Sequence, residues 1–544
     1  MEYSISPVGE KFALPSPEEY PPEFERLRRL AEAARADGKE VVVVMGIGFV
    51  GAVMAAVIAD SVDRKTGKPS KFVIGCQRPS TRSYWKIPLL NRGESPIKAE
   101  DPEIEPLFRR CVLEKKTLVA TFNRDCLRLA DCVVVDVQCD YIKNSLGNVH
   151  DGKVAMADLE ATLRMIAEQV AAHCLVLIET TVAPGTTEFV AYPIMKRAFE
   201  ARGISSDPLL AHSFERVMPG RDYVNSIRNY WRVCSGCNEE SKRRVVKFLE
   251  EVLNTDKYPL TVMDRPIESE TTKIIENSYR ATILAFMDEW SLFAERNGVD
   301  LVKVIEAIKV RPTHSNIMFP GPGVGGYCLP KDGALGCWAY KHILGFDDQI
   351  FRLTTAAIDI NDTRGLHVVV LVRHALEHMG RRIYGARVLL CGASYREDVG
   401  DTRYSGSELI ARRLTEVGAE LSVHDPYVDH WYELEKQDTY PATGMSLSRF
   451  FRNQEGLVNI RVQKDLPAAL RGAEAVIFAV RHKPYLRLDP ADVVKWAGGP
   501  LAVIDCFGIL TDENIRRYLA LGCEVEAMGR GHIQRLRREV RGRE

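Results

Sequence analysis

The sequence has no apolar run long enough to cross a membrane and no excess of charge of either sign. Its 544 residues include 73 Lys and Arg against 74 Asp and Glu, a formal net charge of −1. A spanning helix needs about 20 consecutive apolar residues, and a balanced charge gives no general attraction to nucleic acid or lipid. The polar, proline-bearing first 40 residues also lack the apolar centre of a secretory leader. We therefore expect a cytoplasmic protein with neither membrane nor nucleic acid as partner.

Paired cysteine motifs are also scarce. The thirteen cysteines are odd in number and scattered through apparent strands and helices. The one CxxC motif, Cys234 to Cys237, has no second pair beside it, and it follows a strand-like run at residues 230–233. A zinc or redox role normally needs more than this. We predict reduced thiols, a strand end and turn at the CxxC motif, and no bound metal.

The composition is that of a soluble globular protein. Hydrophobic residues make up 46% of the chain and charged residues 27%. A chain of this length exceeds one ordinary hydrophobic core, so two or three domains are expected.

A dinucleotide-binding pattern begins at residue 40. Residues 41–45 form a continuous, β-branched apolar run, which is typical of a buried parallel strand, and the small residues 52–59 predict a helix. Glycines in the intervening loop would make a tight turn, let the backbone reach a pyrophosphate and allow close helix–strand packing. The order of strand, GxGxxG and helix therefore predicts a nucleotide site rather than a plain turn. The loop consists of Gly46, Ile47, Gly48, Phe49, Val50 and Gly51.

The second predicted strand, residues 72–78, bears on the choice of cofactor. Dinucleotide-binding folds usually place an acidic residue near its end, where it bonds the ribose hydroxyls. This chain has Gln77 and then Arg78. Glutamine can bond a hydroxyl but does not repel a 2′-phosphate. Arg78 and Arg82 could pair with such a phosphate, or both could be solvated loop residues.

One thiol in a glycine-rich run is the strongest candidate for catalysis. Cys328 lies in Gly-Val-Gly-Gly-Tyr-Cys-Leu-Pro-Lys-Asp, residues 323–332. Glycines let the backbone approach a ligand closely. A thiol there can be a covalent nucleophile if its pKa is lowered, or it can be a structural cysteine beside a turn. The dinucleotide pattern upstream favours the nucleophile.

The chain alternates strands and helices twice, on either side of a helical part. The alternation predicts an α/β fold with two Rossmann-like doubly wound domains, joined by a long central helix and a helical spacer. The long helix is expected near residues 268–297, which contain no proline or glycine. The predicted parts are an extension at 1–38 ending in a short charged helix, the first α/β domain at 39–255, the helical part at 256–384, the second α/β domain at 385–530, and a solvated basic tail at 531–544.

Six motifs follow one another along the chain: the glycine loop at 46–51, Leu90 to Ile97, Glu179 to Glu188, Lys273 to Asn277, the cysteine loop at 323–332, and Asp401 to Ser405. Together they resemble the UDP-glucose/GDP-mannose dehydrogenase family, and the resemblance covers residues 40 to 530. A seventh stretch, Ser213 to Gly220, has a Glu-Arg-Val-x-Pro-Gly form that is similar to the N-acetylhexosamine members of that family.

The resemblance implies an N-terminal domain that binds NAD, with NADP possible, a central helix that makes a homodimer, and a C-terminal domain that holds the nucleotide of a nucleotide sugar. It implies that the sugar C6 alcohol becomes a uronate in two hydride transfers, within nucleotide-sugar metabolism and polysaccharide biosynthesis. In this scheme Cys328 adds to the intermediate aldehyde. The thiohemiacetal becomes a thioester, which water cleaves.

The resemblance also assigns the remaining site residues. Lys273 and Asn277, one helical turn apart, would hold an oxyanion and a water, although Lys273 could be a solvated helix lysine. Asp332 would orient water or accept a proton, or cap a helix. Thr181 would position the catalytic water and contact the cofactor, and Glu215 joins the catalytic set. The expected cofactor contacts further include Gln77, Arg78 and Arg403, and the expected substrate contacts are Gly323, Gly325, Gly326, Tyr327 and Arg396.

Two other functions compete with this one. A binding or regulatory homologue that does not oxidise its ligand is suggested by the altered ribose-binding position, Gln77. A simpler 3-hydroxyacid dehydrogenase would perform one hydride transfer, but it would need neither the thiol nor a second Rossmann-like domain. The joint presence of Cys328, Lys273, Asn277 and Asp332 favours the nucleotide-sugar dehydrogenase, because a binding protein needs no such set.

Overall fold

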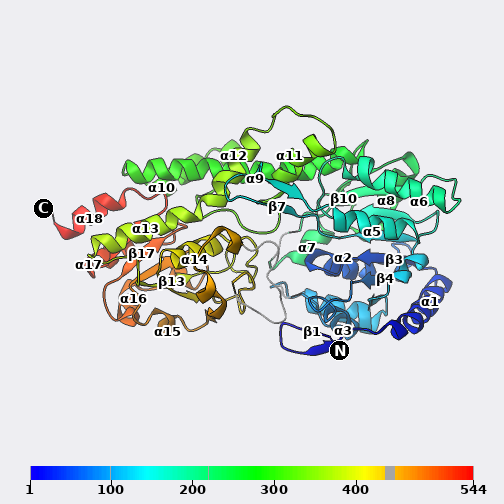
Figure 1. Cartoon of the computed structure of the whole chain (residues 1–544), viewed down its shortest axis with the longest axis horizontal. Helices are drawn as coiled ribbons and strands as arrows, with labels where there is room; N and C mark the ends of the chain where they lie inside the picture. The colour runs from blue at the N-terminus through cyan, green and yellow to red at the C-terminus, as the bar shows by residue number, and fades with distance from the viewer. Residues whose placement is uncertain (1, 98–99, 218–219, 435–446, 543–544) are drawn as a thin grey trace. The chain divides into compact units, whose positions relative to one another are not determined.

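The computed structural model describes residues 2–97, 100–217, 220–434 and 447–542. The chain divides into two compact units (Figure 1). None of the helices in these ranges is both long and apolar enough to cross a membrane. The first unit comprises Met1–Tyr141, Val154–Ile275 and Leu335–Asp348, and the second comprises Ile142–Lys153, Glu276–Ala334 and Gln349–Glu544.

The first unit is built on an eight-stranded sheet in the order β12-β11-β10-β9-β6-β3-β4-β5. Only the β10–β11 pair is antiparallel. Read from β5, the order begins 3-2-1-4-5-6, as in dinucleotide-binding folds. The predicted doubly wound sheet is therefore confirmed. The strands are β3 (Glu40–Met45), β4 (Lys71–Cys76), β5 (Leu118–Thr121), β6 (Cys132–Val135), β9 (Leu175–Ile178), β10 (Leu209–Phe214), β11 (Val233–Gly236) and β12 (Thr261–Val262).

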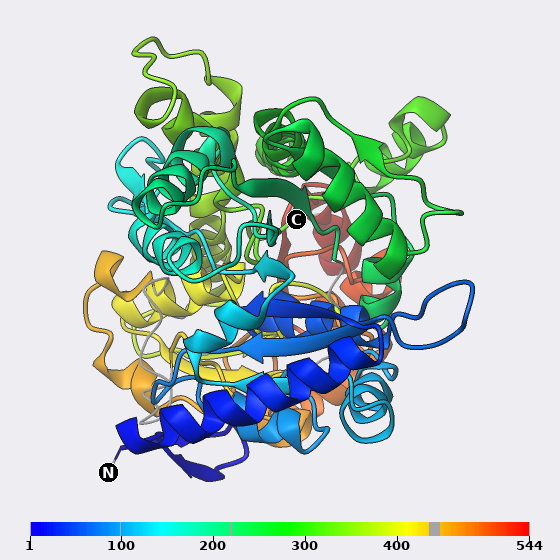
Figure 2. The same cartoon turned by 90° about the vertical axis from the view of Figure 1, so that its right-hand side faces the viewer.

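Helices cover this sheet because its strands are apolar on both faces. Val42 and Val44 of β3 share one core with the small residues of α2 (Phe49–Asp60). α1 (Tyr20–Ala36) packs along β3 and β4 and buries Leu27, Ala31 and Ala34 (Figure 2). The other helices of this unit are α3 (Lys86–Asn91), α4 (Ile104–Arg109), α5 (Ala157–Ala167), α6 (Tyr192–Ala201), α7 (Tyr223–Arg228) and α8 (Glu239–Val252).

Two details of the first unit differ from the sequence predictions. A β-hairpin of β1 (Tyr3–Ile5) and β2 (Lys11–Ala13) precedes α1, where only an extension and a helix were expected. Strand β11 begins at Val233, so Cys234 lies inside the strand rather than at its end. Burial raises the pKa of the Cys234 thiol to about 12. All thirteen cysteines are free thiols.

The second unit contains a six-stranded, fully parallel sheet in the order β15-β14-β13-β16-β17-β18. This is again 3-2-1-4-5-6 in chain order. Separate hydrophobic cores lie on its two faces, one with α13 and α14 and the other with α15 to α18 (Figure 1). The elements are α13 (Gly365–His378), β13 (Arg387–Cys391), α14 (Gly406–Glu416), β14 (Glu420–His424), β15 (Val462–Gln463), α15 (Leu466–Leu470), β16 (Ala475–Phe478), α16 (Pro490–Ala497), β17 (Ala502–Asp505), α17 (Asp512–Ala520), β18 (Glu524–Ala527) and α18 (Ile533–Arg541).

The middle of the chain is helical, as the sequence predicts. α9 (Pro266–Arg296) runs through 31 residues and contains no glycine. Its one proline is at the first position, where proline does not interrupt a helix. Its end falls one residue before the predicted one. A small sheet of β7 (Tyr141–Lys143) and β8 (Gly152–Val154) stands apart from the two large sheets. The remaining helices are α10 (Leu301–Lys309), α11 (Asp332–His342) and α12 (Leu353–Thr363).

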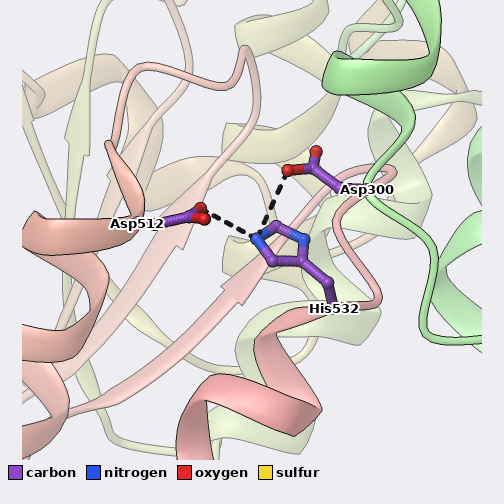
Figure 3. A group of neighbouring side chains, drawn as sticks. All are labelled: Asp300, Asp512 and His532. Carbon is purple, nitrogen blue, oxygen red and sulfur yellow. Dashed lines mark hydrogen bonds and ion pairs between the residues drawn. The ribbon is translucent and has the colours of Figure 1, made fainter.

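The basic tail is solvated at Arg535, Arg538 and Arg541, but one face of it is buried, which was not expected. Ile533 and Leu536 of α18 enter the core of the second unit, because α18 places its apolar residues on one face. The residues just before the helix are also buried. His532 points between the carboxylates of Asp300, at the start of α10, and Asp512 in α17 (Figure 3). Ion pairs therefore fix the chain end to the rest of this unit.

Asp60 forms ion pairs with three basic side chains of the first unit. It ends α2, where a carboxylate is unfavourable to the helix dipole, and three basic side chains compensate it. Arg110 donates two hydrogen bonds of 2.9 Å, Lys115 donates one of 2.7 Å, and Arg228 pairs with the same carboxylate. Burial by itself would raise the pKa of Asp60, but Arg110 and Lys115 lower it to about 2.

We expect Asp60→Asn to lower the free energy of unfolding by about 2 to 4 kcal/mol at pH 7, because three cations lose their anion. A carboxyl whose folded pKa is depressed stabilises the protein above the unfolded pKa, near 3.9, and this stabilisation is lost as pH falls toward 2. The difference between wild type and variant should therefore shrink below pH 4. Urea unfolding at several pH values measures it. Asp37→Asn, which removes an exposed partner of Lys39, is the control, and equal stability of wild type and Asp60→Asn at pH 7 would contradict the account.

Candidate active site

The glycine loop of the first unit is packed so tightly that side chains are excluded at two positions. Gly46 has φ +97°, and a Cβ there would lie 2.5 Å from the carbonyl oxygen of Asp136. A Cβ on Gly51 would lie 2.0 Å from the carbonyl oxygen of Gly46. A Cβ on Gly48 would meet nothing within 4 Å. The loop therefore fits a pyrophosphate, which needs open space beside the backbone at the start of α2.

Gln77 braces this loop. Its Oε1 accepts a hydrogen bond of 3.1 Å from the backbone N–H of Ile47, and its Nε2 donates to the Ser83 hydroxyl at 3.2 Å. Arg78 and Arg82 are exposed. The side chain expected at the ribose thus lies beside the glycine loop, and its role in binding ribose stays a prediction, as do those of Ile47, Phe49, Val50 and Arg78.

Acidic residues gather where three neighbouring strands end. Asp136, Glu179 and Glu215 follow β6, β9 and β10, and the carboxyl ends of parallel strands share one edge of the sheet. Arg232 compensates Glu179 with a buried ion pair of 2.6 Å. Burial, and then the charges of Glu179 and Glu215, raise the pKa of Asp136 well above its usual range. Its neutral form is favoured, which reduces the negative charge near the glycine loop.

Sequence reasoning passed over Asp136, Glu179 and Arg232 as candidates. The available signal was an acidic residue directly after each apolar run: Val135-Asp136, Ile178-Glu179 and Phe214-Glu215.

Lys273 is a buried lysine of α9. Its Nζ donates to the carbonyl oxygen of Glu215 at 2.7 Å and lies 3.9 Å from the Glu215 carboxylate. Its ammonium also lies 5.2 Å from the centre of the Phe214 ring. The alternative of a solvated helix lysine is therefore wrong. Met218 and Pro219, which belong to the same motif as Glu215, lie outside the described residues.

Glu270 holds the segment that carries Thr181. Thr181 is half-buried in the loop after β9. Further along this loop, Glu270 accepts hydrogen bonds from the backbone N–H of Gly185 at 2.6 Å and from the N–H and hydroxyl of Thr187 at 2.8 and 2.6 Å. Burial raises the pKa of Glu270 to about 7 against the effect of these donors. One turn before Lys273, α9 thus fixes the loop after β9.

Cys328 lies in the second unit, at the approach to α11. The thiol is half-buried, and the carbonyl oxygen of Cys328 accepts backbone N–H groups of Lys331 and Asp332 at 3.1 and 3.0 Å. Helix N-termini stabilise a thiolate through their unpaired N–H groups and dipole. Ten of the other twelve cysteines are buried. Cys328 is one of three half-buried thiols, and it is the one that lies in the glycine-rich loop before α11.

A buried polar cluster stands beside the cysteine loop. Asp332 is the first residue of α11, rather than the cap before it, and is fully buried. Its Oδ2 accepts a hydrogen bond of 2.6 Å from Asn277, and its Oδ1 pairs with Lys331 at 3.0 Å. Asn277 and Asp332, which were predicted separately as site residues, are thus in direct contact. Lys331 was missed, although it is adjacent to Asp332 in the sequence.

The glycines of the cysteine loop allow close contact with the segment after β13. A Cβ on Gly325 would lie 2.4 Å from the Cβ of Tyr395, and Gly326, with φ +83°, donates its N–H to the carbonyl oxygen of Arg403 at 2.9 Å. Gly323 has φ +124°, and a Cβ there would lie 2.9 Å from the carbonyl oxygen of Asn361. These contacts leave no room for larger residues, which explains the glycine-rich sequence.

Arg403 faces the same loop. Its guanidinium pairs with Asp401 through contacts of 2.6 to 3.1 Å and lies 5.6 Å from the centre of the Tyr327 ring. The ammonium of Lys331 lies 4.5 Å from that ring centre. Burial opposes the charge of Arg403, but the Asp401 carboxylate holds its pKa above the usual range. The position beside Tyr327 suits an anionic ligand, while the predicted contact of Arg403 with the cofactor remains untested.

A second buried network lies at the carboxyl ends of β13, β14 and β16. Asp425, directly after β14, accepts the backbone N–H groups of Ala393 and Ser394 at 2.7 and 3.2 Å and pairs with His482 at 3.1 Å. The His482 Nδ1 accepts from the N–H of Asp398 at 2.9 Å, so the ring proton lies on Nε2. Arg396 lies in the same segment and is half-buried. The strand order reverses between β13 and β16, and ligands of such sheets bind at that point.

Two groups of side chains in the described ranges could converge on a metal ion, and both are already charge-balanced. In the first, Asp300, Asp512 and His532, the Asp512 carboxylate pairs with Arg530 at 2.9 Å and Lys303 at 2.8 Å. In the second, His378, Glu524 and Glu526, the two glutamates pair with arginines of α18. Ion pairing is thus the better interpretation of both groups.

The structure brings together two sets of predicted residues, one in each unit. The first unit contains the glycine loop, Gln77, Thr181, Glu215 and Lys273. The second unit contains the cysteine loop, Asn277, Asp332, Arg396 and Arg403. Lys273 and Asn277 are four residues apart on the one helix, α9, that runs through both sets.

Comparison with known proteins identifies three consecutive family models in the chain. The NAD binding domain of the UDP-glucose/GDP-mannose dehydrogenase family matches residues 40–254, its central domain matches 267–363, and its UDP binding domain matches 389–512.

Individual relatives agree with these models. The chain is 28% identical over 389 residues to a UDP-N-acetyl-D-mannosamine dehydrogenase of Pyrococcus horikoshii, covering 71% of this chain and 84% of the relative. It is 27% identical over 465 residues to the Yersinia pestis enzyme of the same name, covering 84% and 96%. The crystal structure of an NDP-N-acetyl-D-galactosaminuronic acid dehydrogenase from Methanosarcina mazei Go1 is similar with a TM-score of 0.71 and 26% identity, covering 93% of this chain and 98% of that chain.

We expect Gln77→Glu to increase the preference for NAD over NADP by about tenfold. The substitution keeps the acceptor for Ile47 and adds a negative charge that repels a 2′-phosphate, and charged contacts are stronger than neutral ones by roughly a factor of two. The measurement is kcat/KM for the two cofactors. Gln169→Glu, a glutamine after α5, serves as the control. An unchanged ratio in Gln77→Glu would place residue 77 away from the ribose.

Proposed function

The chain belongs to the UDP-glucose/GDP-mannose dehydrogenase family, and we propose that it oxidises the C6 alcohol of a UDP-linked N-acetylhexosamine to the uronate, with two NAD reduced per sugar. The family chemistry, NAD-dependent oxidation of a nucleotide sugar, is that of the three matched domains. The single observation that supports the two-step reaction is the position of Cys328, which lies at the approach to α11 beside the buried Asn277–Asp332–Lys331 cluster.

The N-acetylhexosamine is inferred from the relatives and from one motif. The relatives of Pyrococcus horikoshii and Yersinia pestis are named for UDP-N-acetyl-D-mannosamine. The stretch Ser213 to Gly220 has the Glu-Arg-Val-x-Pro-Gly form of such enzymes. The nucleotide would bind near the Asp425–His482 network, where Arg396 can approach a phosphate.

Lys273 and Thr181 would serve the first oxidation. The glycine loop would hold NAD, which would supply the acceptor for the hydride that leaves C6. The C6 hydroxyl must give up its proton in the same step, and Thr181, held by the Glu270-braced loop, would orient the water that takes it. The ammonium of Lys273 would stabilise the negative charge that develops on the oxygen. The product of this step is the C6 aldehyde.

Cys328 carries the second oxidation. Its thiolate adds to the aldehyde carbon, and the C–S bond forms as the carbonyl electrons move to oxygen. Asn277 and Lys273 would donate to this oxygen, since both lie on one side of α9. Transfer of a second hydride from this carbon, for which a second NAD would be the acceptor, gives a thioester. Asp332 would hold the water that attacks it, after which the C–S bond breaks, the thiolate leaves, and the uronate is released.

A homodimer forms part of the proposal. In the second unit, α9 exposes four aromatic side chains, each about half accessible, and the last three lie edge to face with ring centres 5.4 and 6.3 Å apart. Exposed apolar patches of this kind mark contact surfaces. A second copy of the chain would cover them, and the free, buried cysteines agree with a cytoplasmic location. The side chains are Tyr279, Phe286, Trp290 and Phe293.

We expect the wild-type protein to reduce two NAD per UDP-N-acetylhexosamine and Cys328→Ser to lose at least about a hundredfold in uronate formation, because an alcohol is a far weaker nucleophile than a thiolate near neutral pH. Absorbance of NADH and mass spectrometry of the sugar follow both steps. Cys337→Ser, which changes a partly buried thiol of α11, should retain activity. One NADH per sugar with aldehyde as the product, or full activity of Cys328→Ser, would disprove the mechanism.

We expect Trp290→Arg to convert dimers to monomers at micromolar concentration, since it places a charge in the centre of an apolar contact. Light scattering after size-exclusion chromatography gives the mass. Trp231→Arg changes an equally exposed tryptophan that packs on Tyr230 and Tyr258 of the first unit and should leave the mass unchanged. A monomeric wild type, or a dimeric Trp290→Arg, would exclude this interface.

A further inference from the structure

The β1–β2 hairpin lies outside the matched NAD binding domain, which begins at residue 40. Its strands are only three residues long and belong to neither large sheet. The hairpin nevertheless lies against the segment between β4 and α3, next to which β1 is drawn in Figure 1. The contacts connect it to the candidate cofactor site of the same unit.

Ser4 forms the central contact. The side chain is fully buried, its hydroxyl donates to the carbonyl oxygen of Thr81 at 2.9 Å, and it accepts from the backbone N–H of Trp85 at 3.1 Å. The indole N–H of Trp85 in turn donates to the carbonyl oxygen of Arg82 at 3.0 Å. One hydroxyl therefore satisfies main-chain groups at both ends of residues 81–85.

An ion pair attaches the tip of the hairpin to the residue that follows α3. Glu10 pairs with Arg92 at 2.8 Å, and the Arg92 guanidinium lies 5.6 Å from the centre of the Phe12 ring. Ser6, which is buried, accepts the backbone N–H of Glu10 at 3.1 Å and so fixes the turn. The hairpin is held at two points, one on each side of α3.

Hydrogen bonds continue from this segment to the glycine loop. The Ser83 hydroxyl donates to the carbonyl oxygen of Arg78 at 3.0 Å, lies 2.8 Å from the Ser80 hydroxyl and accepts from Gln77 at 3.2 Å. Gln77 accepts the N–H of Ile47. A continuous path of polar contacts thus runs from Ser4 through residues 78–85 to the loop that fits the pyrophosphate.

Helix α1 supports the same region from the end of β5. Glu23 accepts a hydrogen bond of 2.7 Å from the Thr121 hydroxyl, and the Asn123 side chain donates to the carbonyl oxygen of Tyr20 at 2.7 Å. The carbonyl oxygen of Thr121 accepts the backbone N–H of Gln77 at 3.0 Å. The segment before residue 40 therefore contacts both sides of Gln77, through residues 78–85 and through β5.

We propose that the N-terminal hairpin is part of the cofactor site and that Ser4 is a positioning residue, which holds residues 78–85 in the conformation that binds the adenosine half of NAD. The inference rests on the proposed cofactor site, in which Gln77 meets the adenosine ribose. It needs no contact between Ser4 and the cofactor. Without the hydroxyl, the carbonyl of Thr81 and the N–H of Trp85 lose their partner, and the segment and Gln77 shift together.

The test measures NAD binding to the full-length protein by calorimetry. Ser4→Ala should raise the Kd for NAD about three- to tenfold, the range of one or two lost hydrogen bonds, and leave the Kd for UDP unchanged. Ser4→Thr, which keeps a hydroxyl, should bind NAD more tightly than Ser4→Ala. Hydrogen exchange of residues 78–85 should increase in Ser4→Ala.

Two further variants guard against a purely structural effect. Ser241→Ala removes another fully buried hydroxyl that has one donor and one acceptor, Leu210 N–H and the Asn238 side chain, far along the sheet from β4. It should leave the Kd for NAD unchanged even if its Tm falls. Glu10→Gln alters the exposed ion pair with Arg92 without opening the core, and should weaken NAD binding by a smaller factor.

The outcomes separate this proposal from the proposed function. If the wild type binds NAD but Ser4→Ala and Glu10→Gln bind it equally well, the hairpin is only a stabilising element and the inference is wrong. Should Ser4→Ala fail to fold, Glu10→Gln decides by itself. A wild type that binds no NAD would overturn the cofactor site as well. Weaker NAD binding in both variants, with unchanged UDP binding, supports the inference.

Discussion

Close backbone packing at the ends of parallel strands is the constraint on which the rest of the structure depends. In the first unit, Gly51 approaches the carbonyl of Gly46, and Gly46 approaches Asp136 at the end of β6, so that no side chain fits at either glycine. This contact sets the direction of α2 and turns its first N–H groups toward the carboxyl edge of the sheet. Asp136, Glu179 and Glu215, which directly follow β6, β9 and β10, lie at the same edge. The anion-binding end of the helix and the acidic residues are thus placed together by the same packing.

The loop after the first strand is held by a hydrogen-bond acceptor in both units, but the acceptor is a different residue type in each. In both sheets the residue directly after the second strand accepts hydrogen bonds from the loop after the first strand. Gln77, after β4, accepts the N–H of Ile47, and Asp425, after β14, accepts those of Ala393 and Ser394. Burial opposes the charge of Asp425, but His482 and the backbone donors lower its pKa below the usual value. Gln77 carries no charge, whereas Asp425 at the corresponding position of the second sheet is a carboxylate.

Helix α9 carries three of the predicted or newly found side chains that make the contacts described above. It provides Glu270, which fixes the loop after β9, then Lys273, which contacts Glu215, and then Asn277, which contacts Asp332. These three side chains come from successive turns of one helix. The same helix exposes aromatic side chains further along its length.

The sequence by itself determined the two Rossmann-like domains, the long helix and the main candidate residues, because each depends on local patterns. Apolar runs followed by glycines or acidic residues predict strands and the loops after them, and Lys273 and Asn277 are one turn apart in any helix. Only the tertiary structure decided which distant groups pair. Ser4 contacts Thr81, which lies 77 positions later in the chain. Asn277 and Lys331 both contact Asp332. The arginine-rich chain end forms a helix whose apolar face enters the core of the second unit. Hydrogen bonds and ion pairs of this kind depend on how the backbone folds back on itself, and no local periodicity in the sequence records that.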